Sequence, residues 1–340
     1  MGTTNLNSRF SANMKGLTIL WALIILCIVM TLLTPSFLTT LNIITVLRQV
    51  SILGILTCGA TFVLLSGGID LSVGSIIALT GVLSTLVSKN ESLPLIIPII
   101  VAVLIGGAIG LINGTGVAYA RIPAFIMTLG LMSIGRGTAL LVAGGKPVVG
   151  LRSDFMEISG TTVFRIGDVP VSSLIICFIV ILAFSIFLLH KTVFGKWVYG
   201  TGGNENAARF SGIKTKPVIL SVYLINGLFA GLCGVLMASR INSGDATVAD
   251  SYALEAIAAT VIGGVSLTGG VGKVWKAVIG AFIIGIIQNG LQIIGMSPFI
   301  QTIIQGAIIV VAVFFDMYMQ NRNKRVKERV IFKKKEDENE

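Results

Sequence analysis

The sequence predicts an all-α polytopic membrane protein with about ten transmembrane helices and with both termini in the cytoplasm. Of its 340 residues, 54% are hydrophobic and 12% are charged, whereas soluble domains average about 25% charged residues. Uncharged apolar runs of membrane-spanning length recur along the chain. The Lys and Arg residues gather in alternate connections between these runs, as the positive-inside rule requires.

Hydropathy marks ten apolar segments. They lie near 17–34, 45–66, 71–88, 93–119, 124–143, 172–190, 217–240, 253–267, 277–296 and 298–318. The segment 253–267 is short and broken by glycines, and counting it as a crossing puts both termini on one side of the membrane. With the termini inside, 18 of the 25 Lys and Arg residues are internal, 6 are external, and Arg136 lies within a span. This bias favours keeping 253–267 as a crossing.

The predicted organisation is a cytoplasmic N-terminal segment (1–16), a membrane domain (17–318) and a charged cytoplasmic tail (319–340). The two long connections are 191–216, placed inside, and 144–171, placed outside. The tail is basic and then acidic, which is typical of a solvated tail near anionic lipid headgroups. The topology explains the net charge of +10, so we expect no nucleic-acid partner.

Chemistry within the chain has few residues to work with. The four cysteines (Cys27, Cys58, Cys177 and Cys233) stand singly in apolar runs, which suggests neither disulfides nor a metal site. His190 is the only histidine, and no G-x-x-x-x-G-K-[ST] phosphate loop is present. We therefore expect no catalytic residues, no metal and no cofactor in this chain, and no enzymatic activity of its own.

The most informative polar segment is 202–213 (GGNENAARFSGI), within the basic connection 191–216. It predicts a short helix over 205–211, with Asn204 as the N-cap and Gly212 as the stop. Two helical turns are marginally stable alone in water, so we interpret the segment as a docking element. The alternative is an ordinary solvated loop. The residues assigned to docking are Gly203, Asn204, Glu205, Ala207, Ala208, Arg209 and Gly212.

Two glycine-interrupted apolar segments, 65–74 (LSGGIDLSVG) and 262–272 (IGGVSLTGGVG), occupy comparable places in the two halves. They suggest an internal repeat. Asp70 and Ser72 can cap the following span, and the segment is then a tight turn and nothing more. A hinge or gate is the functional alternative, and ion coupling through an intramembrane carboxylate is a third. The second segment is either close packing or a gate. The gate or hinge candidates are Gly67, Gly68, Asp70, Ser72, Gly263 and Gly264.

Polar residues inside spans are candidates for a solute path, because a hydroxyl-rich solute needs uncharged donors and acceptors in place of water. Each of them is otherwise an interhelical hydrogen-bond partner. Gln288 and Gln292 are four residues apart and share a helix face. Arg136 is expected to reach the interface or a helix-end partner, or to act near the outer mouth. The candidates are Asn113, Asn226, Gln288, Asn289, Gln292 and Arg136.

The segments 65–74, 202–213 and 262–272, in this order, resemble the permease subunits of ribose-type monosaccharide ABC importers. The resemblance covers about residues 17–318. It implies a multi-pass protein of the bacterial cytoplasmic membrane, with a second permease copy in a homodimer or heterodimer. It also implies a cytoplasmic ABC ATPase subunit, which binds ATP and Mg, and an extracytoplasmic sugar-binding protein. By this resemblance 202–213 is a coupling helix that the ATPase grips.

Two other functions are compatible with the composition. An ion-coupled secondary transporter requires an acidic residue or a histidine relay in the middle of the membrane, and the acids here lie toward the span ends. A permease of the same family for nucleosides or another small polar solute is the second. Amino-acid cargo would require charge-matching groups in the pathway, which the sequence scarcely offers.

Overall fold

The computed structural model describes residues 4–167, 169–311, 313–314 and 317–318; the predicted tail 319–340 lies outside them. Side chains are described from Thr18 onward. The elements are α1 (Thr4–Leu33), α2 (Thr40–Leu65), α3 (Val73–Ser88), α4 (Ile96–Ala118), α5 (Ala124–Ala143), α6 (Ser153–Glu157), β1 (Thr162–Ile166), β2 (Val169–Ser172), α7 (Ser173–Lys191), α8 (Val193–Gly203), α9 (Glu205–Phe210), α10 (Thr215–Ile241), α11 (Tyr252–Ile262) and α12 (Val274–Ile293). A further apolar helix covers Pro298–Val311.

Each of the ten predicted apolar segments coincides with a helix, but only six helices are long and apolar enough to cross a membrane alone. These are α2, α4, α5, α7, α10 and α12. The shorter apolar helices are Thr18–Leu33 within α1, α3, α11 and Pro298–Val311. The polytopic all-α class is thus confirmed, and the count of ten crossings stays a prediction.

The helix α10 runs through the centre of the bundle and packs on α4, α3 and α2. Small residues allow this packing, because α4 and α10 meet through glycines on both sides. A Cβ atom on Gly106 would collide with the backbone of Gly227 and Gly231, and one on Gly110 would collide with Tyr223 O. Backbones in such contact gain dispersion energy over a large area without needing a hydrophobic effect.

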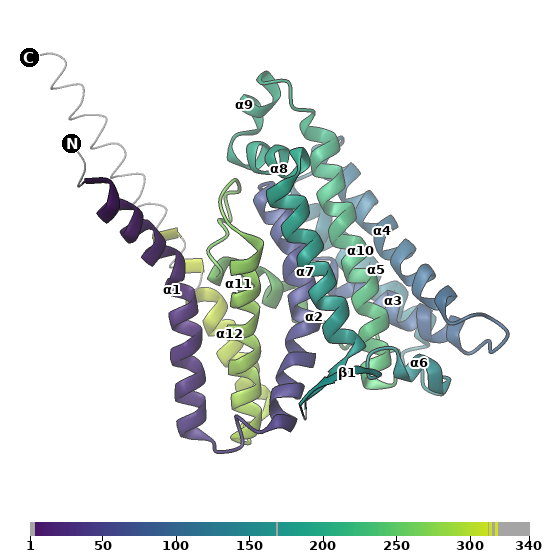
Figure 1. Ribbon diagram of the computed structural model, residues 1–340. Helices are drawn as coiled ribbons and strands as arrows, with labels where there is room; N and C mark the ends of the chain where they lie inside the picture. The colour runs from purple at the N-terminus through teal and green to yellow at the C-terminus, as the bar shows by residue number, and fades with distance from the viewer. Residues whose placement is uncertain (1–3, 168, 312, 315–316, 319–340) are drawn as a thin grey trace, which may run out of the picture.

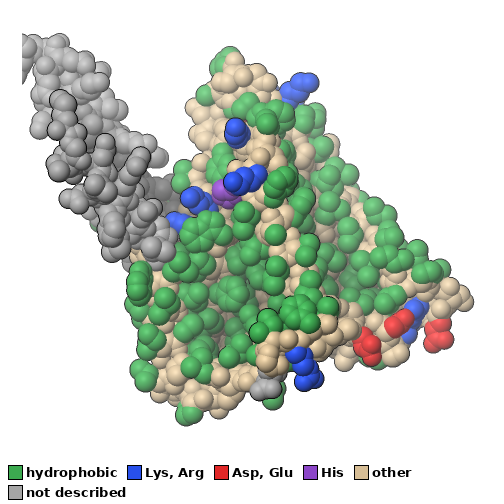
Figure 2. Space-filling view, in the orientation of Figure 1, with side chains coloured by type: hydrophobic (Ala, Val, Ile, Leu, Met, Phe, Trp, Pro, Cys, Tyr) green, Lys and Arg blue, Asp and Glu red, His purple; other side chains and the backbone are tan. Residues whose placement is uncertain are grey.

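The bundle has two chemically different ends. In Figure 1, α8 and α9 form one end, and α6 with the β1–β2 hairpin forms the other. In Figure 2, the side chains around α8 and α9 that carry charge are Lys and Arg, whereas near α6 Asp and Glu side chains lie beside basic ones. The end that carries 191–216 is therefore the basic one, as the sequence predicts for the cytoplasmic side. The antiparallel β1–β2 hairpin inside 144–171 was not predicted.

The segment 253–267 needs a correction, because the helix in it, α11, has only 11 residues and ends at Ile262. At 1.5 Å per residue, α11 spans about 16 Å, roughly half of a hydrocarbon core. The chain still travels from one end of the bundle to the other. Gly244 pairs with Val148 beside the outer loops, and Gly270 bonds to Leu65 at the α8–α9 end. The missing length is covered by the non-helical stretch 242–251 before α11, which is polar and lies outside the predicted apolar segment.

The first helix also differs from expectation. The segment 1–16 was separated from the first span by its polarity, yet α1 begins at Thr4 and continues without a break to Leu33. No proline occurs in this stretch, so nothing in the backbone stops a helix that the apolar part has already nucleated.

A candidate coupling site

The element α9 lies at the tip of the basic end, as a separate short helix beyond α8 (Figure 1). Asn204 Oδ1 accepts a hydrogen bond from the Ala207 amide at 2.9 Å, which satisfies one amide of the first turn. The helix stops at Phe210, and Gly212 follows with a φ of +87°, a conformation that suits glycine. The predicted cap, helix and stop are confirmed.

Most of α9 faces away from the protein. Ala207 and Arg209 are exposed, and Phe210 keeps 87% of its surface accessible. Ala208 alone turns inward and is buried. The described part of the chain does not cover the Phe210 ring. This large exposed apolar side chain at the tip of α9 is suited to contact another protein.

The inner side of α9 is attached to the central helix. Thr215 Oγ1, in the first turn of α10, donates to Glu205 Oε1 at 3.1 Å. Beside this contact is a hollow of about 480 Å³ whose rim is basic. Its charged residues are Arg121, Glu205, Arg209, Lys214 and Lys216. The surroundings of α9 therefore favour an acidic partner surface.

The three glycine-rich segments meet directly beneath α9. The Gly270 amide donates to Leu65 O at 2.9 Å, which joins 262–272 to the end of α2. Gly202, at the end of α8, fits between these two segments. A Cβ atom there would collide with Leu65 O and would stand 2.9 Å from the Gly270 amide nitrogen. A Cβ atom at Gly269 would in turn stand 2.7 Å from Gly202 O and 2.9 Å from the Gly67 amide nitrogen. We call these four glycines and Leu65 the glycine junction.

A further bond ties α8 to this junction, since Tyr199 Oη donates to Gly272 O at 2.8 Å. Among the remaining hinge candidates, Gly264 has a positive φ and open space around it, whereas Gly263 packs against Ala277. Gly68 lies against the Tyr223 hydroxyl. A displacement of α8 and α9 would thus reach both glycine-interrupted segments through backbone contacts.

Asp70 is buried between α2, α3 and α10, where neutral polar groups surround it. Its Oδ1 atom accepts from the Ser72 amide at 2.9 Å and from the Ser72 hydroxyl at 2.6 Å. Asn226 Nδ2, from α10, donates to its Oδ2 atom at 2.9 Å. Asp70 therefore closes the turn before α3, as expected. Ser72 makes no side-chain cap of α3; its hydroxyl donates to Asp70 and accepts from Asn113 Nδ2 instead.

Asn113 and Asn226, both candidates for the solute path, bond to the Asp70–Ser72 turn, Asn226 to the carboxylate and Asn113 to the Ser72 hydroxyl. Asn113 Nδ2, from α4, donates to Ser72 Oγ at 2.8 Å, and both asparagines are fully buried. Their Oδ1 atoms have no hydrogen-bond partner. We call Asp70, Ser72, Asn113 and Asn226 the Asp70 cluster. It joins α3, α4 and α10 at the segment 65–74, and no sequence pattern predicts that these four residues meet.

The polar residues of α12 serve mainly as links to α2. Gln49 Nε2 donates to Gln288 Oε1 at 3.0 Å. Asn289 and Asn42 bond reciprocally, at 2.8 and 3.0 Å. Gln292 is exposed. This is the interhelical alternative for Gln288 and Asn289, and their assignment to a solute path remains a prediction.

Arg136 forms an ion pair with Asp250, in the stretch before α11, and its Nη1 atom donates to Ala246 O at 2.6 Å. Arg136 therefore pairs with a residue at a helix end, which is the first of the two alternatives that the sequence predicts for it. Asp250 could not have been named as that partner from the sequence, because 113 intervening residues separate the two positions.

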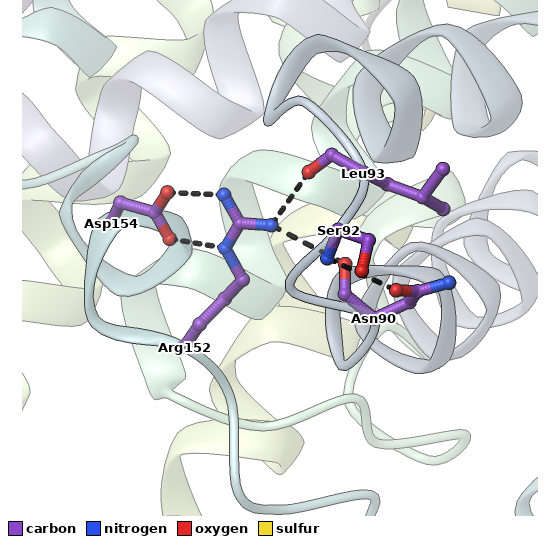
Figure 3. Close-up of polar contacts among 5 residues, drawn as sticks. All are labelled: Asn90, Ser92, Leu93, Arg152 and Asp154. Atoms are coloured by element: carbon purple, nitrogen blue, oxygen red, sulfur yellow. Dashed lines mark hydrogen bonds and ion pairs between the residues drawn. The ribbon is translucent and has the colours of Figure 1, made fainter.

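The outer loops are held by a second arginine (Figure 3). Arg152 binds the Asp154 carboxylate through two parallel bonds of 2.5 and 2.6 Å, and its Nη1 atom donates to Leu93 O at 2.8 Å. The guanidinium holds the pKa of Asp154 below its usual value, chiefly by hydrogen bonding. Phe155 is fully buried beneath them. The loops 89–95 and 144–160 are thereby joined into one surface.

Comparisons with known proteins agree with this architecture. A family model described as "Branched-chain amino acid transport system / permease component" matches residues 42–313. The chain is 40% identical to the ribose import permease protein RbsC of Bacillus subtilis (strain 168), over 91% of this chain and 94% of that protein. It is 37% identical to the L-arabinose ABC transporter permease protein AraH of Azospirillum brasilense, over 93% of this chain and 91% of that protein.

The D-allose transport system permease protein AlsC of Escherichia coli (strain K12) is also 37% identical, over 82% of this chain and 84% of that protein. No solved structure matches the chain. Within the described residues, no group of three or more His, Cys, Asp and Glu side chains is placed to hold a metal ion. The family model covers most of the chain, and the chain therefore belongs to this family of multi-pass transport permeases.

Proposed function

We propose that the chain is the membrane-spanning subunit of an ATP-binding cassette importer, which carries a pentose or hexose across the bacterial cytoplasmic membrane by alternating access. A separate ATPase subunit, binding ATP and Mg, drives the cycle by pushing on α9. The relatives named for ribose, L-arabinose and D-allose support a monosaccharide cargo.

The observation that carries the proposal is the backbone contact of Gly202, at the end of α8 just before α9, with both glycine-interrupted segments. Gly202 lies against Leu65 and Gly270, so a force on α8 and α9 acts on 65–74 and 262–272 together. Interfaces in which backbones touch are stiff, because no side chain can yield between them. This arrangement is suited to convert ATPase closure into a rearrangement of the membrane domain.

The remaining partners fit the two ends of the molecule. Arg152 joins the loops 89–95 and 144–160 into one surface. This surface lies at the end of the bundle opposite to α9, and a sugar-binding protein would dock there. A second permease copy, identical or homologous, would complete the membrane core. In this arrangement 1–16, 191–216 and 319–340 are cytoplasmic, 144–171 is external, and the chain crosses the membrane ten times.

The position of Asp70 argues against ion coupling. A coupling carboxylate must exchange its ion with water, which requires a solvent-lined position. Asp70 is 4% exposed, and both of its oxygens accept hydrogen bonds from neutral groups. None of the described hollows of the molecule is lined by it.

The test reverses one charge on α9. In cells that also produce the cognate ATPase and binding protein, Arg209→Glu should lower uptake of the transported sugar by about tenfold or more, because an acidic partner surface would repel it. The matched control is Arg165→Glu on the exposed hairpin at the other end, which should leave co-purification with the ATPase unchanged, whereas Arg209→Glu should weaken it. Uptake is measured with labelled D-ribose, L-arabinose and D-allose, and ATP hydrolysis is measured in purified complexes. Normal uptake by Arg209→Glu, with the protein inserted and abundant, contradicts docking at α9.

A further inference from the structure

A polar groove opens between α3, α5 and the stretch before α11. Its volume is about 560 Å³, within the range of small-molecule sites. It is lined by Leu71, Gly74, Ser75, Met132, Ser133, Arg136, Gly137, Leu140 and Asp250. Arg136 is the thirteenth of the 20 residues of α5, roughly 18 Å along that helix. The groove therefore lies at the depth of the helical bundle and not on the loops beyond it.

The charges in this groove cancel within the protein. Arg136 is bonded to Asp250 and to Ala246 O, so its guanidinium is oriented by two partners. The Asp250 side chain is nonetheless 70% exposed, and only its Oδ1 atom takes part in the ion pair. A carboxylate oxygen that is reachable beside a fixed guanidinium offers an acceptor and a donor to adjacent hydroxyl groups.

The rest of the lining suits a neutral polyol. Ser133 is exposed, and its hydroxyl donates to Leu129 O at 3.2 Å and keeps lone pairs that can accept from a ligand, whereas Ser75 is 1% exposed and donates to Ser72 O at 2.8 Å. Leu71, Met132 and Leu140 supply apolar surface for the carbon face of a sugar ring. Gly137 leaves the wall open, since a Cβ atom there would meet nothing within 4 Å.

The groove is also linked to the moving parts described above. Leu71, Gly74 and Ser75 follow directly on the Asp70 cluster, and Gly74 lies against the Ala249 backbone next to Asp250. A displacement of the broken segment 65–74 would therefore change the width of the groove.

From these contacts we infer that the Arg136–Asp250 groove is a sugar-binding subsite of the translocation path, in which the ion pair recognises neighbouring hydroxyl groups. The inference rests on the proposed function. A zwitterionic amino acid is a poorer fit, because the two charges that would match it already neutralise each other.

The first experiment fills the groove. Gly137→Ala, Gly137→Leu and Gly137→Phe place increasing volume in open space on α5, and each favours the helix more than glycine does. Gly306→Phe is the matched control, since Gly306 also has open space and lies outside the groove, in Pro298–Val311. Uptake of labelled D-ribose, L-arabinose, D-allose and L-leucine is measured in cells with the full transport system, and assembly with the ATPase is measured by co-purification.

We expect uptake to fall with side-chain size at position 137, at least tenfold for Gly137→Phe, while assembly and the Gly306→Phe control stay unchanged. Unaltered uptake by Gly137→Phe overturns the inference and leaves the proposed function intact. Loss of assembly in Gly137→Phe also overturns it, because the face is then subunit packing. Absence of sugar uptake by the unmodified protein, or uptake of leucine alone, defeats the proposed function itself.

The second experiment tests recognition. Asp250→Asn keeps the shape of the side chain but removes the carboxylate. A subsite predicts a changed ratio of uptake among the three sugars, by about threefold or more, because their hydroxyls are arranged differently. A purely structural ion pair predicts that all three rates fall by the same factor, and that result rejects the assignment.

Discussion

Asn226 connects the central helix to the one buried carboxylate of the broken segment. Its amide group donates to Asp70 Oδ2, and its Oδ1 atom lies against Gly59 of α2, where a Cβ atom would collide with it. The residue is thus fixed by bonding on one side and by packing on the other. In this hydrogen bond α10 supplies the donor and the segment 65–74 supplies the acceptor. Because Asn and Asp have the same shape, donor and acceptor can be exchanged by substitution.

That exchange gives a sharp prediction. Asn226→Asp places two carboxylates against each other in a buried site, which should cost about 2 kcal/mol or more, since one must take up a proton. The double variant Asp70→Asn with Asn226→Asp restores a donor facing an acceptor and keeps both Ser72 bonds. Thermal unfolding and uptake should both be impaired in the single variant and recover in the double one. If the double variant is no better than Asn226→Asp, the bond does not hold this segment.

At the scale of elements, α12 is fastened to α2 by paired amides and not by charge. Asn42 and Asn289 exchange two hydrogen bonds, and Gln49, about two turns further along α2, donates to Gln288, the residue before Asn289. Such pairs satisfy polar groups that would otherwise be stranded among apolar side chains.

Breaking one member of this pair should therefore be worse than removing both. Asn289→Leu leaves Asn42 without its partner and should destabilise the protein by about 1–2 kcal/mol. Asn42→Leu with Asn289→Leu should be closer to the unmodified protein, because no side-chain amide is left unpaired and only the bond from Asn42 to Phe37 O is lost in addition. Thermal unfolding in detergent measures both. Equal destabilisation in the two variants would show that the asparagines act through shape alone.

The elements themselves were largely predictable, and their contacts were not. Apolar periodicity and length placed all ten apolar segments, and the N-cap and stop of α9 followed from Asn204 and Gly212. Hydropathy could not show that α11 is only half a span, because it counts the non-helical residues 263–267 as part of the same apolar segment. The Asp70 cluster and the Arg136–Asp250 pair were invisible for a different reason. Each joins residues that only the packing of separate helices brings together, and the pattern of a single sequence does not show which helices pack against each other.

The whole molecule is polarised along its long axis. The basic end carries α8 and α9, and the end with α6 carries acidic side chains (Figure 2). The positive-inside rule then assigns α9 to the cytoplasm. This orientation is independent of the number of helices that span the membrane fully.

Thiol labelling checks the orientation directly. Val163→Cys lies on the exposed hairpin and Ser211→Cys lies just after α9. A membrane-impermeant thiol reagent added to intact spheroplasts should modify the first and spare the second, and inverted vesicles should give the opposite pattern. Cys27 and Cys177 are only partly buried, so the unmodified protein serves as the blank. Labelling of Ser211→Cys from outside would reverse the proposed topology.

The glycine junction has a consequence for how such a protein can change its cargo. Gly202, Gly269 and Gly270 have no side chains, and any larger residue would strike a neighbouring backbone. The glycine junction therefore cannot accept larger residues, whereas the groove at Arg136 and Asp250 has room for other side chains. In the proposed function, coupling and selectivity therefore depend on separate residues, and exchanging a few groove side chains would change the transported sugar without altering the glycine junction.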